Sequence, residues 1–241
     1  MASEYLKWKY KDVQPDPPAE YTKRQKRQNW WYYHKWHVLI AALLIVLAAD
    51  LARIVLHIGV TDPDVQVAYV GSTYLPDETA AALEAALSTM VPDGDGDGKT
   101  VVQLNQYIFL NEDTDAQLTA VNATKLMIDL DQRYSYLFLL EDPSSFQEDY
   151  SVLAHLDGSL PEEGDISAND CCLLWTDCPV LTHLDLGTYT DTQGENCGSQ
   201  KRLSGLYIGR RGFWTEKTAA NPDACQALWE VVTEGAGLPA S

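Results

Sequence analysis

The sequence predicts an α/β fold, in which one transmembrane helix precedes a domain with a mostly parallel β-sheet flanked by helices. A long apolar run near the N-terminus predicts the spanning helix. After it, β-rich apolar runs alternate with stretches of helical periodicity, a pattern typical of βαβ units. The predicted organisation is a flexible basic tail at 1–36, a membrane helix at 37–60 and a compact domain at 61–241, which is long enough for its own core.

The apolar run from Val38 to Val60 reads VLIAALLIVLAADLARIVLHIGV. As a helix it is roughly 34 Å long, and the hydrocarbon core of a bilayer is about 30 Å thick. A cleaved signal peptide and a buried core helix are the alternatives. Five aromatic residues stand just before the run, and the basic segment 23–27 precedes them. These flanks favour a helix that spans the cell membrane once, with the N-terminus in the cytoplasm and 61–241 outside the cell.

Two charged residues, Asp50 and Arg53, lie inside the predicted span. Their spacing of three places them on one helix face, where they can neutralise each other. The alternative interpretation is a contact with a polar group of another membrane protein, because charge inside a membrane is costly and often functional. The predicted partners of this segment are therefore the lipid bilayer and, through Asp50 and Arg53, a second membrane protein.

Charge is unevenly distributed along the chain. Residues 1–36 hold eight basic and four acidic side chains, whereas residues 61–241 hold eight basic and 30 acidic ones, a net charge of −22. A domain with this charge repels nucleic acid and anionic lipid headgroups. Nucleic-acid binding by the outer domain is therefore excluded.

Turn signals divide the domain into alternating elements. The chain after Pro76 has acids in its first turn, which favours a helix start, and Asn221 before Pro222 predicts the N-cap of a closing helix. The stretch 151–205 lacks a regular period and is predicted to be irregular. The predicted strands are 65–70, 100–110, 134–140 and 206–210, and the predicted helices are 77–90, 113–131, 143–150 and 221–234.

Several segments carry a resemblance to known proteins: YYHKWHVLI (32–40), VAYVGSTYLP (67–76), DGDGDGKTVV (93–102), YLFLLEDPSSFQ (136–147), the DCPVL and LDLGTY pieces of 177–189, and LSGLYIGRRGFW (203–214). Together they resemble a group of uncharacterised single-pass membrane proteins of Clostridia-like bacteria. The strand–helix–strand opening is similar to one lobe of extracellular solute-binding proteins. The resemblance implies an outer domain with that lobe's fold, although a solute-binding protein closes two lobes on its ligand.

The run DGDGDG at 93–98 is the most specific local motif. Asp93, Asp95 and Asp97 occupy the first, third and fifth positions of an EF-hand-type loop, and Gly98 supplies the turn. The twelfth position is Leu104 instead of a bidentate Glu, so a true EF-hand is rejected. Two interpretations remain: a degenerate Ca²⁺ site built from these three carboxylates and the Lys99 carbonyl, and a solvated turn rich in Asp and Gly.

Catalytic motifs are missing from the sequence. It has no G-x-S-x-G, P-loop, G-x-G-x-x-G or H-E-x-x-H pattern, and no C-x-x-C pair for a metal.

The domain contains five cysteines, and an outward-facing domain permits disulfides. The pairs Cys172–Cys178 and Cys197–Cys225 are possible and would leave Cys171 unpaired. The sequence RRGFW at 210–214 is a local positive spot in an acidic domain. Two interpretations are open: the arginines pair with nearby carboxylates while the aromatic residues close the core, or the segment binds an anionic ligand or partner.

These observations predict a membrane-anchored, non-catalytic outer domain that binds a partner protein or acts as an accessory component of a membrane complex. The alternative is a receptor or sensor domain that binds a small solute or Ca²⁺. A deep pocket lined by convergent polar groups would favour the alternative.

Overall fold

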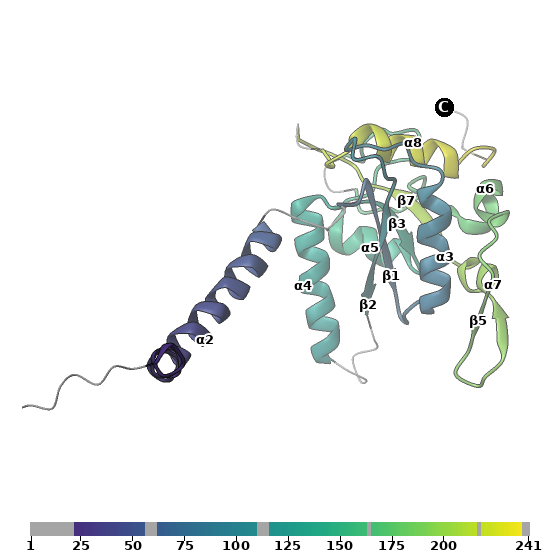
Figure 1. Ribbon diagram of the computed structural model, residues 1–241. Helices are drawn as coiled ribbons and strands as arrows, with labels where there is room; N and C mark the ends of the chain where they lie inside the picture. Colours follow the sequence, from purple (N-terminus) through teal and green to yellow (C-terminus); the bar gives the residue numbers. More distant parts are fainter. Residues whose placement is uncertain (1–21, 56–61, 110–115, 163–164, 216–217, 238–241) are drawn as a thin grey trace, which may run out of the picture. The chain divides into compact units, whose positions relative to one another are not determined.

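The computed structural model describes residues 22–55, 62–109, 116–162, 165–215 and 218–237, with the side chains of 53–55 excepted. The chain divides into two compact units, residues 1–60 and 61–241. The first unit contains the helix α2 (Lys23–Val55), and the second contains every strand of the described chain (Figure 1).

Helix α2 begins fourteen residues before the membrane helix predicted at 37–60. The cause is a capping box at Thr22 and Gln25: the Thr22 backbone N–H donates to Gln25 Oε1 at 2.9 Å, and the Gln25 N–H donates to Thr22 Oγ1 at 3.4 Å. The prediction of a flexible tail was therefore wrong for residues 23–36. Residues 1–21 and the predicted end of the helix at 56–60 lie outside the described residues.

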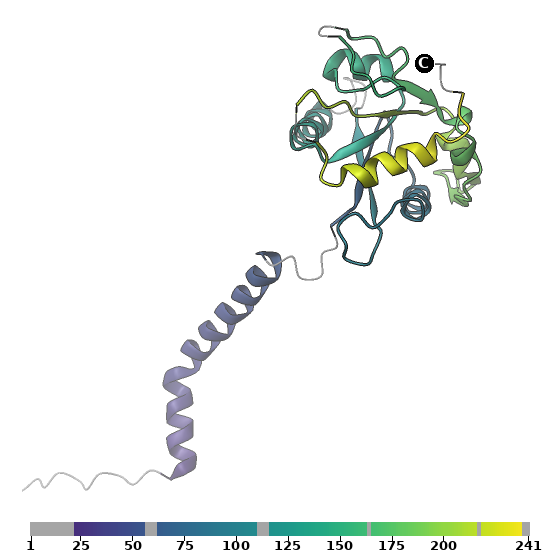
Figure 2. The same cartoon turned by 90° about the horizontal axis from the view of Figure 1, so that it is seen from above.

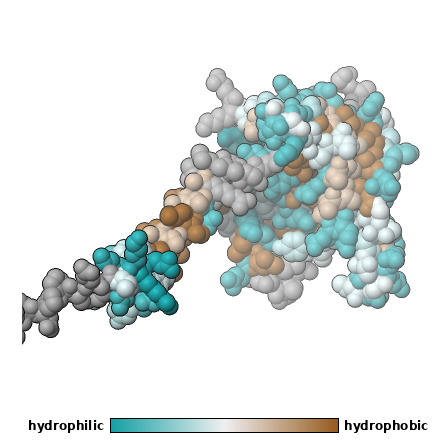
Figure 3. Space-filling model, in the orientation of Figure 1, coloured by the Kyte–Doolittle hydropathy of each residue, from teal (hydrophilic) through white to brown (hydrophobic). Residues whose placement is uncertain are grey.

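The section Lys23–Ala52 of α2 is long and apolar enough to cross a membrane, and no part of its most apolar window is buried. Figure 3 shows this apolar stretch as a brown band beside the hydrophilic, basic start of the helix. A core helix of a soluble protein would be buried, so that alternative does not apply. A helix of this composition near the N-terminus serves as a membrane anchor or as a signal sequence.

The second unit is built on a mixed five-stranded sheet in the order β2-β1-β3-β7-β4. Strand β1, next to the edge strand β2, pairs in parallel with β2 and β3, whereas β7 runs antiparallel to β3 and β4. The predicted α/β fold is confirmed, and β7 is the one strand of this sheet that opposes the others. The strands are β1 (Val65–Gly71), β2 (Val102–Ile108), β3 (Ser135–Leu140), β4 (Cys172–Leu174) and β7 (Tyr207–Arg210).

Helices cover both faces of this sheet, so the strands alternate between two apolar clusters (Figure 2). In β3, Leu137 and Leu139 pack on the side of α3 and α8, and Phe138 and Leu140 pack on the side of α4 and α5. This explains why β3 is buried along its whole length. The helices are α3 (Asp77–Ser88), α4 (Ala116–Gln132), α5 (Pro143–Tyr150) and α8 (Pro222–Val232).

The segment 151–205, which the sequence predicts to be irregular, contains several short elements. Besides β4 they are the 3₁₀ helix η1 (Trp175–Asp177), α6 (Pro179–Thr182), the hairpin of β5 (Thr188–Thr190) and β6 (Asn196–Gly198), and α7 (Ser199–Leu203). Asn221 occupies the predicted N-cap position of α8, and Pro222 is the first helical residue. The Asn221 side chain makes no capping bond to α8 and instead donates from Nδ2 to the Asp64 carbonyl at 3.1 Å.

Candidate functional site

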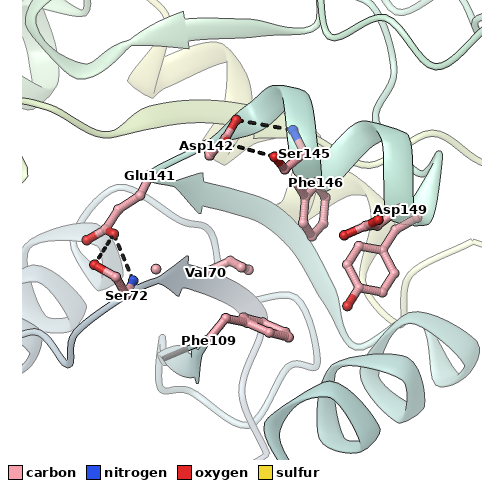
Figure 4. A pocket seen from close by; sticks show the side chains of 10 residues that line it. Val70, Ser72, Phe109, Glu141, Asp142, Ser145, Phe146 and Asp149 are labelled. Atoms are coloured by element: carbon pink, nitrogen blue, oxygen red, sulfur yellow. Dashed lines mark hydrogen bonds between the residues drawn. The ribbon is translucent and has the colours of Figure 1, made fainter. Parts of the chain in front are cut away.

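The sheet has a topological switch point between β1 and β3. The connection that leaves the carboxyl end of β1 runs through α3 on one face, and the chain that leaves the carboxyl end of β3 enters α5 on the other face, so the chain diverges at these two neighbouring ends. In open α/β sheets, ligands bind in the crevice outside these ends. A cavity of about 270 Å³ lies there (Figure 4). It is lined by Val70, Gly71, Ser72, Phe109, Glu141, Asp142, Ser145, Phe146, Asp149 and Tyr150.

Glu141 follows β3 directly and joins it to the end of β1. Its Oε2 accepts hydrogen bonds from the Ser72 backbone N–H and hydroxyl, both at 2.7 Å (Figure 4). Its Oε1 accepts from the Tyr69 hydroxyl at 2.8 Å. Burial raises the pKa of Glu141, but the Ser72 and Tyr69 hydrogen bonds and the charge of Arg202 outweigh it, so that the pKa lies below its usual value. Glu141 is therefore a charged carboxylate at neutral pH.

Arg202 on α7 completes this network from a distant part of the chain. Its Nη2 lies 3.3 Å from Glu141 Oε1, 2.6 Å from Thr73 Oγ1 and 3.2 Å from the Tyr69 hydroxyl. Burial, followed by the hydrogen bond and charge of Glu141, raises the pKa of Tyr69 well above its usual value. The Tyr69 phenol is thus a permanent donor that helps to fix the rotamer of Glu141.

Gly71 allows the end of β1 to approach these groups. A Cβ atom at this position would meet the Tyr69 hydroxyl and would lie 2.8 Å from Glu141 Cδ. Any larger residue would therefore displace the carboxylate or the phenol. The close packing of Tyr69 and Glu141 around the end of β1 therefore requires a glycine at position 71.

Asp142 caps α5 and places its charge at the mouth of the cavity. Its Oδ1 accepts from the backbone N–H groups of Ser144 and Ser145, both at 3.1 Å, and Pro143 stands at the first helical position. The Ser145 hydroxyl and backbone hydrogen bonds lower the pKa of Asp142. The N-terminus of α5 is consequently occupied by the protein's own carboxylate.

Apolar side chains form the other side of the cavity. Phe146 is buried, and its ring lies 5.2 Å from that of Tyr150, centre to centre. Val70 at the end of β1 and Phe109 after β2 face them across the cavity (Figure 4). The cavity therefore combines an apolar wall with three carboxylates, those of Glu141, Asp142 and Asp149, and none of its lining residues is basic.

The predicted metal residues Asp93, Asp95 and Asp97 lie elsewhere, in the loop between α3 and β2. The carboxylates of Asp93 and Asp95 form a group with that of Asp64, in which the oxygens lie within 4.8 Å of one another. Asp97 is outside this group, and its Oδ1 accepts from the Lys99 backbone N–H at 2.7 Å. The structure thus brings together two of the three predicted residues and adds Asp64, which the sequence analysis missed.

The loop at 93–98 satisfies its carboxylates from its own backbone. Asp93 accepts from the N–H groups of Gly96 at 2.7 Å and Gly98 at 2.9 Å, and these bonds lower its pKa. Buried Asp64 accepts from Gly94 and Val101, at 2.7 and 2.8 Å. The same acids that would ligate a cation therefore also define the turn. The metal assignment stays a prediction.

The cysteine pairs predicted from the sequence do not form, because all five cysteines are free thiols. Cys225 on α8 is buried in the larger apolar cluster, whereas Cys197 lies half-buried in the β5–β6 hairpin. Cys172 is in β4, and Cys178 is buried before α6.

The arginines of the RRGFW segment are buried and serve the core. Arg210 donates from Nη2 to the Leu156 carbonyl at 2.9 Å, and its guanidinium lies 5.0 Å from the Trp229 ring centre. Arg211 donates to the Leu130 carbonyl, and its Nη1 has no partner among the described residues. These arginines bond to carbonyls and stack on aromatic rings, and the expected carboxylate pairing is not seen in the described part of the chain.

The remaining predicted contact concerns the helix predicted to span the membrane. Asp50 is exposed on α2, and the side chain of Arg53 lies outside the described residues. Their pairing and their contact with another membrane protein stay predictions.

Sequence reasoning missed the network at the carboxyl edge, which consists of Tyr69, Ser72, Glu141 and Arg202. One signal was present: Glu141 and Asp142 stand immediately after the most apolar strand, where a parallel sheet exposes its ligand-binding edge. No local signal pointed to Arg202, which lies in the segment without periodicity. Comparison of the chain with protein-family models, with curated proteins and with solved structures gave no match.

Proposed function

We propose that this chain is a membrane-anchored, non-catalytic binding protein whose outer domain takes a small solute in the carboxyl-edge cavity. The observation that carries the proposal is the position of this cavity at the switch point between β1 and β3. Polar groups from three separate elements converge beside it, namely Ser72 after β1, Glu141 after β3 and Arg202 on α7. Such convergence beside an apolar wall is typical of solute sites.

Anchoring is supported by α2. Its apolar section follows a basic stretch and an aromatic belt, an arrangement that retains the N-terminus in the cytoplasm and the domain outside the cell. The domain's excess of acids also disfavours contact with an anionic membrane surface. The proposal therefore places the binding cavity outside the cell.

A non-catalytic role is supported by the chemistry of the lining residues. Glu141 and Asp142 have pKa values below the usual range, so both are weak bases and neither can donate a proton at neutral pH. The lining contains no histidine, cysteine or lysine. These groups are suited to binding and orienting a ligand.

The proposal is tested with the full-length protein in nanodiscs of zwitterionic lipid, screened against a diverse set of small solutes by ligand-observed NMR. Ser145 lines the cavity and Ser144 does not, although both donate a backbone N–H to Asp142. Ser145→Trp should abolish binding of the solutes found, and Ser144→Trp should retain it. Solutes that bind equally to both variants, or a screen without any bound solute, would refute the proposal.

Membrane anchoring needs a separate experiment. We expect the full-length chain to stay in the membrane pellet after alkaline carbonate extraction, and protease added to intact cells to remove the domain. Release of residues 61–241 into the medium as a soluble fragment would instead identify α2 as a signal sequence.

A further inference from the structure

The cavity at the carboxyl edge carries uncompensated negative charge. Of its three carboxylates, Glu141 is paired with Arg202, which leaves the charges of Asp142 and Asp149. Asp142 accepts hydrogen bonds from Ser144 and Ser145 only, and these are neutral donors. Asp149 makes no hydrogen bond or ion pair with the described residues. A bound cation would therefore meet two carboxylates without a competing basic group.

The donors at this edge are not available to an anion. The N-terminus of α5 is capped by Asp142, and the Ser72 N–H and hydroxyl are bonded to Glu141. Arg202 is held by Glu141 and Thr73 and does not line the cavity. An anionic ligand would face carboxylates without a free donor, so the electrostatics exclude carboxylates and phosphates.

The apolar wall defines the rest of the ligand. The rings of Phe109, Phe146 and Tyr150 line the cavity together with Val70. Figure 4 shows Phe109 and Phe146 on the side away from Glu141 and Ser72. Aromatic faces attract both apolar groups and cations. A bare metal ion would leave this wall unfilled, and a neutral apolar molecule would make no use of the exposed Asp149 carboxylate.

The size of the cavity limits the ligand to a small molecule. Its volume of about 270 Å³ corresponds to roughly nine water molecules at their liquid volume. One ring or a short branched chain with one charged group fits this space.

We infer that the ligand is a small organic ammonium, in which the cationic nitrogen contacts Asp149, the charge of Asp142 adds attraction at longer range, and the apolar body lies against Phe109, Phe146 and Tyr150. This inference rests on the proposed function, since it names the ligand class of the same cavity. The ammonium N–H groups donate to the Asp149 carboxylate, and no covalent bond is formed or broken.

The test compares four probes by calorimetry with the full-length protein in zwitterionic nanodiscs, after subtraction of heats from empty nanodiscs. Phenylethylammonium has both the charge and the ring; phenylethanol lacks the charge, methylammonium lacks the ring, and phenylpropionate has the opposite charge. We expect phenylethylammonium to bind about tenfold or more tightly than the other three, because a charge-assisted contact to a carboxylate and the burial of a ring are each worth that factor. Its affinity should fall as salt rises.

Matched variants assign the effect to the cavity. Asp149→Asn should weaken phenylethylammonium binding by about tenfold, whereas Glu148→Gln, which removes the same charge from the neighbouring position of α5 outside the cavity, should not change it. Phe109→Ala should weaken phenylethylammonium and leave methylammonium unchanged.

The outcomes separate this inference from the proposed function. If phenylethanol or phenylpropionate binds as tightly as the ammonium and Ser145→Trp abolishes that binding, the cavity is a solute site and the inference about charge is overturned. Equal weakening by Asp149→Asn and Glu148→Gln would show general electrostatic attraction and would also overturn it. If none of the four probes binds, the inference fails, and the diverse solute screen decides on the function.

Discussion

Arg202 Nη2 lies 3.3 Å from Glu141 Oε1, and the two residues join α7 to the end of β3 across 61 positions of sequence. Both side chains are about one quarter exposed, at 26% and 27%, so solvent weakens their attraction. Because each also bonds to Tyr69, the pair acts as a clamp on the carboxyl edge of the sheet.

The strength of this clamp is measurable by a double-mutant cycle. We expect Glu141→Gln and Arg202→Met to show a coupling energy of about 0.5–1 kcal/mol in urea unfolding of the full-length protein in mild detergent. The pair Asp131→Asn and Arg202→Met, which share no partner among the described residues, should be additive. Additivity of the first pair would mean that the ion pair contributes nothing to stability.

The second prediction concerns buried Asp129 on α4. Its Oδ2 accepts from the Tyr107 hydroxyl at 2.5 Å and from the Ser135 hydroxyl at 2.7 Å, and its Oδ1 accepts from the Ser135 N–H at 2.9 Å. Asp129→Asn places an amide donor against these donors and should destabilise the protein by about 2–3 kcal/mol. The exposed neighbour Asp131→Asn should cost less than about 0.5 kcal/mol in the same unfolding experiment. Equal effects would argue against a buried network.

The third prediction concerns pH. The folded pKa of Asp142 is lowered by the Ser145 and Ser144 hydrogen bonds, so the charged cap stabilises the fold above the unfolded pKa of about 3.9, and this stability is lost as pH falls through the folded pKa. Asp142→Asn keeps an N-cap without a titrating group. The melting temperature of the wild type should therefore fall relative to Asp142→Asn below about pH 4. A constant difference from pH 3 to pH 7 would contradict the effect.

The fourth prediction concerns the loop at 93–98. Gly98 has φ of +82° with open space around it, so Gly98→Ala strains only the backbone and should cost about 1 kcal/mol. Gly205→Ala, also in open space but without positive φ, is the control and should be close to neutral.

Calcium provides an independent measurement on the same loop. Since Asp64, Asp93 and Asp97 are held by backbone N–H groups, we expect the loop to keep its conformation after treatment with a chelator, with an unchanged melting temperature. A rise in melting temperature with millimolar Ca²⁺ that Asp93→Asn abolishes and Asp97→Asn preserves would assign a cation site to the group of Asp64, Asp93 and Asp95.

The fifth prediction concerns thiol reactivity. Burial raises the pKa of Cys171 and Cys178 to about 11 and that of Cys172 and Cys225 to about 12. At pH 7 roughly one in ten thousand or fewer of these thiols is ionised, so they should react slowly. Half-buried Cys197 should be the first to react with a maleimide, as read by mass spectrometry, and Cys197→Ser should remove this rapid phase. Cys172 is also half-buried, but its raised pKa should keep it slow, and rapid labelling of Cys172 would contradict that expectation.

Most of the longer elements could be predicted, because they carry a full hydrophobic period or clear turn signals. The helix at 143–150 matches α5 at both ends, since Asp142 and Pro143 fix its start. The elements of 151–205 could not be predicted, because β4 and α7 contain only three and five residues and show no measurable period. The start of α2 was also missed, although Thr22 and Gln25 have the spacing of a capping box.

The candidate site was less accessible to sequence reasoning than the fold. Asp93, Asp95 and Asp97 attract notice because they are adjacent in sequence, whereas the partners of Glu141 come from positions 69, 72 and 202. Only the pairing of β1 with β3 and the placement of α7 bring these groups together. Sites of this kind depend on long-range contacts, which no local pattern encodes.

The position of β1 in the sheet has a mechanical consequence. It is the first strand after the proposed anchor, and it is hydrogen-bonded on one side to β2 and on the other to β3. A pulling force from the bilayer would act along β1 and would load its hydrogen bonds to β2 and to β3 in shear, so that many of these bonds must break together. A strand at the edge of the sheet has hydrogen bonds on one side only and can peel away one bond at a time. Attachment through an interior strand of the sheet therefore gives a tethered domain a high resistance to unfolding under force.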